Sequence, residues 1–259
     1  MDIQGRIALI TGAAGGIGFA IAQALAEKGA YVKLADIDQH ELQRAARKIP
    51  HAEAVTLDVT DREQWSAVKA RFPIVGILVN NAGIGPDGTM LSDMDAASFD
   101  RIIRINLTSV FNGISTFSAA MRERRSGYIV NTSSLAGLTA SPKLGGYTAA
   151  KFGVVGLSEV LRAELAPYGV GVSVLCPGYV PTRLAETTGK SGSLTPSVNL
   201  SSATTTPLDA AIVGRMVVEG IESEKPLIVT HGEYCEYVKA RLDAVVAAFE
   251  GVPASTDYR

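Results

Sequence analysis

Tyr147 and Lys151 are the two residues whose types and spacing most directly suggest chemistry. They stand four positions apart in the run from Gly145 to Gly153. If this run is helical, both side chains project from one face, and an ammonium group lies beside a phenol. Tyrosine has an ordinary pKa of about 10, and a nearby positive charge favours the phenolate. We therefore predict that Lys151 lowers the pKa of Tyr147 and makes it a proton carrier. The spacing alone also fits an exposed helix face.

A glycine-rich turn near the start of the chain is the second candidate site. Residues 11–18 read Thr-Gly-Ala-Ala-Gly-Gly-Ile-Gly, after an apolar segment and before a helical pattern. Glycines let the backbone turn tightly and approach a ligand, and a helix N-terminus offers N–H groups to an anion. The spacing differs from the commoner dinucleotide pattern of Gly-x-Gly-x-x-Gly. We interpret the turn as a pyrophosphate site; close strand–helix packing is the alternative.

Acidic residues end the next two predicted strands. Asp36 is placed to accept hydrogen bonds from an adenosine ribose, and its charge would repel a 2′-phosphate. The glycine turn holds no Lys or Arg, and Ile37 follows the aspartate. This charge pattern favours NAD over NADP. Asp58 is a candidate for the adenine edge, although both acids could simply be solvated strand ends.

Strand-like and helix-like segments alternate along the 259 residues. Apolar runs bounded by turn residues predict strands over 6–11, 31–36, 52–57, 74–80, 127–132, 170–175 and 227–230. Helical periodicity predicts helices over 17–28, 38–48, 62–71, 96–121, 147–167, 207–221 and 233–249. Such an alternation indicates one α/β domain, with a doubly wound parallel sheet covered by helices on both faces.

Two segments depart from this alternation. Residues 187–207 are rich in Ser, Thr, Gly and Pro, and we interpret them as a mobile lid over a pocket. The helix predicted over 233–249 carries Val238, Leu242, Val245 and Phe249. Apolar positions of this kind indicate packing against the body or a partner, although the helix could also cover part of a substrate cleft.

These residues together resemble the short-chain dehydrogenase/reductase family, over about residues 5–230. The motifs occur in family order: the glycine turn, Asn80-Asn81-Ala82-Gly83, Asn106, Asn131-Thr132-Ser133-Ser134, the Tyr147/Lys151 pair, and Pro177-Gly178 with Thr182. Ser134 lies thirteen residues before Tyr147, which is the usual family spacing, so Ser133 is the weaker candidate. One departure is the run His231-Gly232-Glu233-Tyr234 after the last strand, where many members have an Asp-Gly-Gly-like turn. It puts the usual subunit contacts at this edge in doubt.

The resemblance implies a seven-stranded Rossmann-type sheet and a catalytic set of Asn106, Ser134, Tyr147 and Lys151. Tyr147 would exchange a proton with the substrate oxygen, Ser134 would orient that oxygen, and Lys151 would hold the nicotinamide ribose. Asn106 would hold a water that links Lys151 to solvent; a purely structural bridge is the alternative. The residues expected to contact NAD are Thr11, Gly12, Gly15, Gly16, Ile17, Gly18, Asp36, Ile37, Asp58, Val59, Asn81, Ala82, Gly83, Tyr147, Lys151, Pro177, Gly178, Val180 and Thr182.

The composition of the chain limits the kinds of partner that we expect. The formal net charge of −2 does not favour nucleic acid, and the longest apolar runs are too short to span a bilayer. The start of the chain shows no signal-peptide pattern, and two distant cysteines do not form a disulfide framework, so we expect a cytoplasmic protein. The three histidines lack metal-ligand spacing, and we interpret each as a surface or core residue. The resemblance implies a homo-oligomer, most often a tetramer formed through the long helices.

The segments expected to line the pocket are fairly apolar. They are the loop over 83–94, residues 135–147, Tyr179 and the segment 187–207. We therefore predict an NAD-dependent oxidoreductase for a medium-sized, mostly apolar secondary alcohol or ketone, whether aromatic, alicyclic or steroid-like. The alternatives are a reductase of 3-oxoacyl thioesters and, from another class, a non-catalytic dinucleotide sensor.

Overall fold

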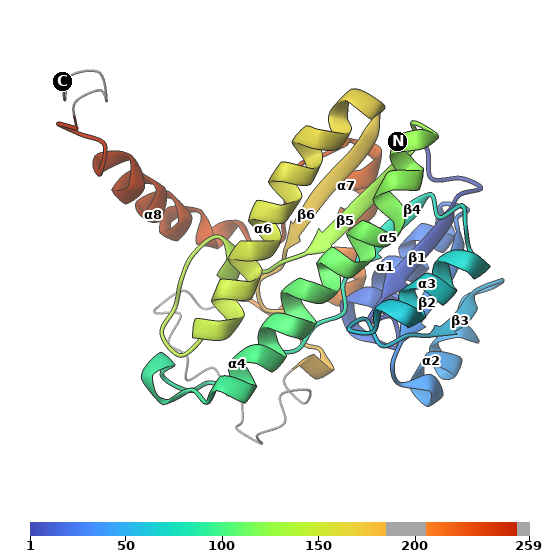
Figure 1. Ribbon diagram of the computed structural model, residues 1–259, viewed down its shortest axis with the longest axis horizontal. Coiled ribbons are helices and arrows are strands. Elements are labelled where there is room, and N and C mark those ends of the chain that lie inside the picture. Colours follow the sequence, from blue (N-terminus) through green and yellow to red (C-terminus); the bar gives the residue numbers. More distant parts are fainter. Residues whose placement is uncertain (185–205, 253–259) are drawn as a thin grey trace.

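The computed structural model describes residues 1–184 and 206–252, and within them a seven-stranded parallel sheet lies between two layers of helices (Figure 1). The strand order is β3-β2-β1-β4-β5-β6-β7. The strands are β1 (Ile7–Thr11), β2 (Tyr31–Asp36), β3 (Glu53–Thr56), β4 (Ile77–Asn80), β5 (Gly127–Thr132), β6 (Val170–Cys176) and β7 (Leu227–Val229). This Rossmann-type arrangement confirms the predicted fold class.

The helices divide between the two faces of the sheet. One apolar core packs α1, α2 and α7 against the sheet, and the other packs α3, α5 and α6 against the opposite face. The helices are α1 (Gly16–Glu27), α2 (Gln39–Ala46), α3 (Arg62–Arg71), α4 (Ala96–Ile103), α5 (Ser109–Glu123), α6 (Gly145–Leu165), α7 (Ala210–Glu222) and α8 (Cys235–Ala247). Both faces of the central strands are buried, which explains their unbroken runs of Val, Ile and Leu.

The chain reverses direction across the sheet between β1 and β4. From β1 the chain builds outward through β2 and β3, and it then returns to place β4 on the other side of β1. Such a switch point opens a crevice at the carboxyl ends of the strands. At this crevice, Thr11 links the end of β1 to the segment after β4. Its Oγ1 accepts hydrogen bonds from the N–H groups of Asn81 (2.9 Å) and Ala82 (3.0 Å).

The single helix predicted over 96–121 is interrupted. A π-helical turn, Arg104–Thr108, separates α4 from α5. Within it, Asn106 is fully buried, and the Ser109 hydroxyl donates to the carbonyl of Ile105 at 2.5 Å. A π-helical turn within an α-helix often marks a functional site. The predicted helix is therefore present as α4, the π-helical turn and α5, and the prediction missed only the π-helical turn, at the position where a catalytic asparagine was expected.

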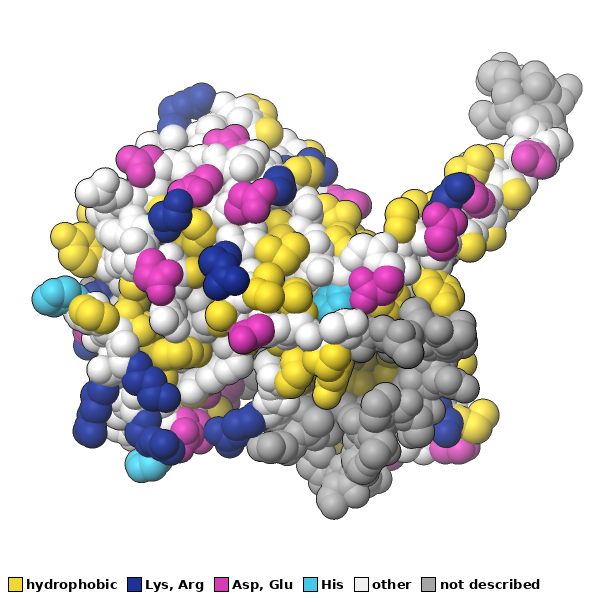
Figure 2. All heavy atoms as spheres, turned by 180° about the vertical axis from the view of Figure 1, so that it is seen from behind, with side chains coloured by type: hydrophobic (Ala, Val, Ile, Leu, Met, Phe, Trp, Pro, Cys, Tyr) yellow, Lys and Arg dark blue, Asp and Glu magenta, His cyan; other side chains and the backbone are white. Residues whose placement is uncertain are grey.

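Helix α8 projects away from the body (Figures 1 and 2). None of its residues is buried, and Leu242, Val245 and Phe249 are 50%, 47% and 74% exposed. From the middle of the helix, the Arg241 guanidinium lies over the Phe152 ring of α6 at 4.7 Å. The apolar positions of α8 therefore do not pack against the body, and the alternative of packing against a partner stays a prediction. The predicted lid, 187–207, lies almost wholly outside the described residues.

Candidate active site

The glycine turn approaches neighbouring backbone so closely that side chains are excluded. A Cβ atom on Gly18 would lie 2.3 Å from the carbonyl oxygen of Gly12, and one on Gly12 would lie 2.8 Å from Cα of Ala82. Gly12 and Gly16 also have positive φ angles of 65° and 55°. These three positions therefore require glycine for the fold of the turn itself.

The same turn fits a dinucleotide pyrophosphate. Helix α1 begins at Gly16 without a side-chain cap and without an acidic residue in its first turn. A Cβ atom on Gly15 would meet no atom within 4 Å, so the surface of the turn is open there. Uncapped N–H groups and the positive end of the helix dipole favour an anion at this place. Thr182 lies against the turn, because a Cβ on Gly16 would be 3.1 Å from its methyl group.

Asp36 stands at the end of β2, beside the glycine turn. Its carboxylate accepts hydrogen bonds from the N–H groups of Ala14 and Asp38, both at 3.1 Å. These bonds fix the carboxylate next to the turn, where it was predicted to meet the adenosine ribose. Ile37, which follows it, is 67% exposed. Its side chain is therefore available to cover a bound ring.

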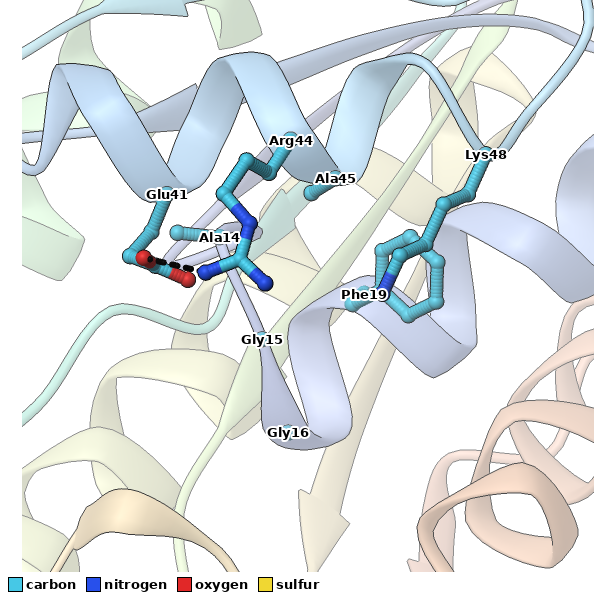
Figure 3. A pocket seen from close by; sticks show the side chains of 8 residues that line it. All are labelled: Ala14, Gly15, Gly16, Phe19, Glu41, Arg44, Ala45 and Lys48. Atoms are coloured by element: carbon cyan, nitrogen blue, oxygen red, sulfur yellow. Dashed lines mark hydrogen bonds and ion pairs between the residues drawn. The ribbon is translucent and has the colours of Figure 1, made fainter.

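A pocket of about 250 Å³ adjoins this carboxylate and was not predicted. Figure 3 shows Glu41, Arg44 and Lys48 of the α2 region facing the turn, with Ala14, Gly15, Gly16 and Phe19 on the other side. Arg44 pairs with Glu41 at 2.9 Å, and the Lys48 ammonium lies 5.7 Å from the centre of the Phe19 ring. The turn itself lacks cations, yet the fold brings two beside it. The spacing of Arg44 and Lys48, four residues apart in a segment predicted to be helical over 38–48, was the signal in the sequence.

The residues after β3 and β4 form the adjoining rim. The carboxylate of Asp58 accepts hydrogen bonds from the N–H and the hydroxyl of Thr60, both at 2.8 Å. The carbonyl of Val59 accepts from Trp65 Nε1 and Asn112 Nδ2, at 2.9 and 3.1 Å. Asn81 holds the rim to β1, because its Nδ2 donates to the carbonyl of Thr11 at 3.0 Å. All three residues thus have structural partners, and the contact of Asp58 with adenine and of Val59 and Asn81 with the cofactor stays a prediction.

Tyr147 and Lys151 lie on one face of α6 and are buried. The Lys151 ammonium is 5.5 Å from the centre of the Tyr147 ring and donates to the carbonyl of Thr132 at 3.0 Å. Only 8% of Tyr147 and 4% of Lys151 are exposed. The pair is therefore part of an enclosed site at the carboxyl end of β5, and the alternative of an exposed helix face is wrong.

Ser134 joins this pair from the segment that follows β5. Its side chain lies close enough to the Tyr147 phenol to lower the pKa of that phenol. Its Oγ also accepts from the N–H of Ala136 at 3.1 Å and donates to the carbonyl of Pro177 at 3.4 Å. Ser133 points elsewhere, because its hydroxyl donates to the carbonyl of Lys151 at 2.8 Å. The structure therefore places Ser134, and not Ser133, beside the phenol.

Burial dominates the protonation of these groups. It raises the pKa of Tyr147, and the neighbouring Ser134 side chain only partly opposes this rise. Burial also lowers the pKa of Lys151, from 10.5 to about 8. The direction for Tyr147 is the reverse of our prediction, because the desolvation of the phenolate is the largest effect on its pKa and Lys151 is not among the groups that shift it. At neutral pH the site thus presents a neutral phenol beside an ammonium group.

Asn106 reaches the same site from the π-helical turn. Its amide exchanges two hydrogen bonds with the backbone of Ile84, both at 3.0 Å. A Cβ on Gly83 would lie 2.6 Å from Asn106 Oδ1 and 3.7 Å from Lys151 Nζ. The side chain therefore makes the structural bridge that was the alternative reading. Its role in holding a water stays a prediction.

The remaining predicted cofactor residues follow β6. Pro177 and Gly178 lie beside Ser134, since the carbonyl of Pro177 accepts from the N–H of Leu135 at 2.9 Å. Val180 is buried in the core that α1 and α7 share. The structure therefore gathers the glycine turn, the rim after β4, Ser134, Tyr147 and Lys151 along one edge of the sheet.

This combination of a Rossmann-type sheet, an open glycine turn and a buried Tyr147/Lys151 pair agrees with the fold that the family resemblance implied. Residues 6–192 match the family described as short chain dehydrogenase. A 3-oxoacyl-(acyl-carrier-protein) reductase from Haemophilus influenzae is 38% identical over 193 residues, 71% of this chain and 78% of that protein. Levodione reductase from Leifsonia aquatica is 36% identical over 195 residues, 71% of this chain and 73% of that protein.

Solved structures agree with these sequence relatives. A short chain dehydrogenase/reductase from Burkholderia phymatum, in complex with NAD, superposes with a TM-score of 0.85 at 28% identity. The match covers 98% of this chain and 99% of that one. The chain therefore belongs to the short-chain dehydrogenase/reductase family of oxidoreductases. In the ranges 1–184 and 206–252, no helix could cross a membrane, and no cluster of His, Cys, Asp or Glu could hold a metal ion.

Proposed function

We propose that this protein catalyses NAD-dependent hydride transfer between a secondary alcohol and the corresponding ketone. The observation that carries the proposal is the enclosed cluster of Ser134, Tyr147 and Lys151, on the same sheet edge as the open glycine turn. One sheet supplies both the nucleotide-binding turn and the acid–base group. We accordingly propose that the chain acts as one domain.

Each side chain suits a separate task. Tyr147, with its raised pKa, is a neutral phenol that can donate a proton to a carbonyl oxygen, and in the reverse direction its phenolate form accepts the proton of an alcohol. Ser134 lies beside that phenol, whose pKa it lowers, and can fix the substrate oxygen there. Lys151, held by Thr132, supplies positive charge where negative charge develops. NAD, when bound, supplies the carbon that accepts or releases hydride.

Among secondary alcohols and ketones, we propose a mostly apolar substrate. Leu135 is buried beside Ser134, whereas Tyr179 and Leu184 are 53% and 37% exposed near the end of β6. Such surfaces favour apolar alcohols over polyols. The similarity to levodione reductase adds support.

A panel of alcohols read by NADH absorbance tests the substrate class. We expect cyclic and aromatic secondary alcohols to give kcat/KM values at least about tenfold above those of small polyols, because each buried methylene adds about 0.8 kcal/mol of binding. Turnover of polyols alone would reject the apolar substrate class but not the hydride-transfer chemistry.

Reduction of 3-oxoacyl thioesters is the competing activity, and the Haemophilus influenzae relative favours it. Adding a 3-oxoacyl thioester with NADH or NADPH to the same panel decides between them. A dinucleotide sensor without catalysis is a weaker proposal, because it gives no reason to keep Ser134, Tyr147 and Lys151 together in an enclosed site.

NAD in preference to NADP is a second testable part of the proposal. The carboxylate of Asp36 is fixed beside the turn and would repel a 2′-phosphate. We expect kcat/KM to be at least about tenfold higher with NAD, since an unfavourable charge contact costs more than about 1.4 kcal/mol. Asp36→Ser should raise kcat/KM for NADP by about tenfold.

The pocket beside the turn provides the control for this experiment. Arg44 is the nearest candidate to meet a 2′-phosphate once Asp36 is removed, so Asp36→Ser/Arg44→Ala should lose the gain with NADP. Equal rates with both cofactors in the unmodified protein would contradict the assignment of Asp36 as the selecting residue.

We further propose a homo-oligomer, a tetramer or a dimer, in the cytoplasm. Phe111 on α5 and Val160 on α6 are 46% and 58% exposed, and α8 adds a further exposed apolar face. Exposed apolar surface on long helices supports association with another copy. Both cysteines, Cys176 and Cys235, are free thiols, which suits a reducing compartment. Light scattering on the purified protein measures the number of subunits.

A further inference from the structure

The segment after β7 places a buried histidine against Gly178, next to the candidate active site. His231 is 4% exposed, and its Nδ1 lies 3.2 Å from the backbone nitrogen of Gly178. Thr230 Oγ1 lies 3.1 Å from the same nitrogen and 2.6 Å from His231 Nδ1. The N–H of Gly178 therefore donates toward two side chains that follow the last strand of the sheet.

The contact with Gly178 requires one of the two ring tautomers. When Nδ1 accepts from the N–H of Gly178, the ring proton is on Nε2. The Thr230 hydroxyl can then donate to Nδ1 and accept from Gly178. Nε2 is buried and has no hydrogen-bond partner among the described residues. A buried polar atom without a partner lowers the stability of the fold. The burial of this imidazole therefore costs stability, which suggests that the ring is kept for a role other than stabilising the fold.

The imidazole also packs directly against the backbone. A Cβ atom on Gly178 would lie 2.7 Å from Cγ and Nδ1 of His231. The Tyr234 ring meets His231 edge to face, with the ring centres 6.5 Å apart. The ring is thus held between Tyr234 and Gly178, and its Nδ1 remains directed at one backbone N–H.

That N–H belongs to the same peptide unit as the carbonyl of Pro177. On this carbonyl edge, Ser134 Oγ donates at 3.4 Å and the N–H of Leu135 at 2.9 Å. On the opposite edge, Thr230 and His231 receive the N–H of Gly178. A peptide unit is planar, so fixing one edge also fixes the direction of the other. The direction of the Pro177 carbonyl in turn determines where the Ser134 hydroxyl can lie.

We propose that His231 is a positioning residue that, with Thr230, holds the 177–178 peptide unit and thereby orients Ser134. The proposal rests on the proposed function, in which Ser134 fixes the substrate oxygen. His231 does not itself touch the reacting groups. It acts through one peptide unit, from a segment of sequence that was interpreted only as surface or core.

Two variants separate the acceptor from the packing of the ring. His231→Phe keeps a ring of similar size and removes Nδ1, whereas His231→Asn loses volume but keeps an acceptor near the position of Nδ1. We expect kcat to fall by about 10- to 100-fold in the Phe variant, because small displacements of a positioning group cost rates of this order. The Asn variant should recover more than half of the activity that the Phe variant loses. Its smaller side chain should nevertheless make it the less stable of the two on heating.

Hydrogen exchange gives a readout that does not depend on turnover. The peptide containing Gly178, followed by mass spectrometry, should exchange at least about tenfold faster in His231→Phe than in His231→Asn or the unmodified protein. Thr230→Val, which leaves the imidazole in place, should give an intermediate rate. This variant also serves if a His231 variant does not fold.

The outcomes are distinct. Faster exchange and slower turnover in the Phe variant, with rescue by Asn, support the proposal. An Asn variant as impaired as Phe, or a Phe variant with unchanged exchange, overturns it. If no substrate is turned over by the unmodified protein, the proposed function fails, while the exchange experiment still decides whether His231 holds the peptide unit.

Discussion

Replacing Tyr147 by Phe should lower kcat by about 10³-fold or more while leaving NAD binding within about twofold. The phenol hydroxyl is the acid–base group beside Ser134, and a positioned proton carrier contributes about 10²- to 10⁴-fold to a rate. The change removes one oxygen atom and keeps the ring that packs with Ile84, Ile102 and Ala150. Folding should therefore be preserved. Steady-state rates and calorimetric titration with NAD measure the two quantities.

Ser133→Ala provides a matched control for this variant. Ser133 neighbours Ser134 in sequence, yet its hydroxyl bonds to the carbonyl of Lys151, so its loss should affect stability more than kcat. A Tyr147→Phe enzyme with more than a tenth of the original kcat would refute Tyr147 as the proton carrier. Unchanged function of any kind in that variant would favour a dinucleotide sensor.

The pH dependence of turnover should follow from the same phenol. Because burial raises the pKa of Tyr147, the phenolate is scarce at neutral pH. The rate of alcohol oxidation should therefore rise about tenfold per pH unit below that pKa, whereas ketone reduction should not rise. This rise should be absent in Tyr147→Phe.

Replacing Lys151 by Met should be nearly as damaging, with kcat/KM reduced by about 10²- to 10⁴-fold. Its ammonium is the buried positive charge near the Tyr147 ring and is held by Thr132 at 3.0 Å. Preorganised charge of this kind stabilises a developing negative charge, and losing one such donor costs about 10²- to 10³-fold. Lys151→Arg keeps the charge but not the compact shape, so it should recover only part of the loss.

Lys151→Met should raise the free energy of unfolding at neutral pH, although it lowers activity. Burial lowers the pKa of Lys151 from 10.5 to about 8. Below pH 8 the folded protein carries the full cost of a buried ammonium. Above pH 8 it has lost a proton that the unfolded chain still binds, so the free energy of unfolding rises with pH. The methionine variant lacks this cost and should be the more stable of the two at pH 7.

The useful window for this measurement is pH 8 to 9. Burial raises the pKa of the Cys176 thiol from 9.0 to about 12, so above pH 9 the unfolded chain loses a proton that the folded protein keeps. That effect lowers stability and opposes the contribution of Lys151. Between pH 8 and 9, the free energy of unfolding of the unmodified protein should gain about 1 kcal/mol on that of Lys151→Met. Urea titrations at the two pH values measure it, and parallel curves would contradict a buried, pKa-shifted lysine.

Much of the site could be predicted because its residues stand close together in the sequence. Residues 31–36, 62–71 and 127–132 form elements with the predicted boundaries, since their apolar patterns and caps are local signals. The glycine turn stood out from its own composition, whereas the Tyr147/Lys151 pair and Ser134 were assigned from the order and spacing of motifs in the family resemblance. The structure places them on one sheet edge because parallel strands end at the same side.

Other features depended on groups that only the fold brings together. The π-helical turn at Asn106 arises where its amide meets the backbone of Ile84, and no local pattern signals that contact. Arg44 and Lys48 reach the glycine turn only because α2 packs beside it.

The sequence by itself thus determined the family, the order of the elements and the chemical groups at the site. The tertiary structure decided the protonation of those groups, because the pKa values of Tyr147 and Lys151 depend on how much water the surrounding chain excludes. It also decided that His231 faces Gly178 across 53 residues of sequence. Spacing records which residues are present, whereas burial and long-range contacts exist only once the chain has folded.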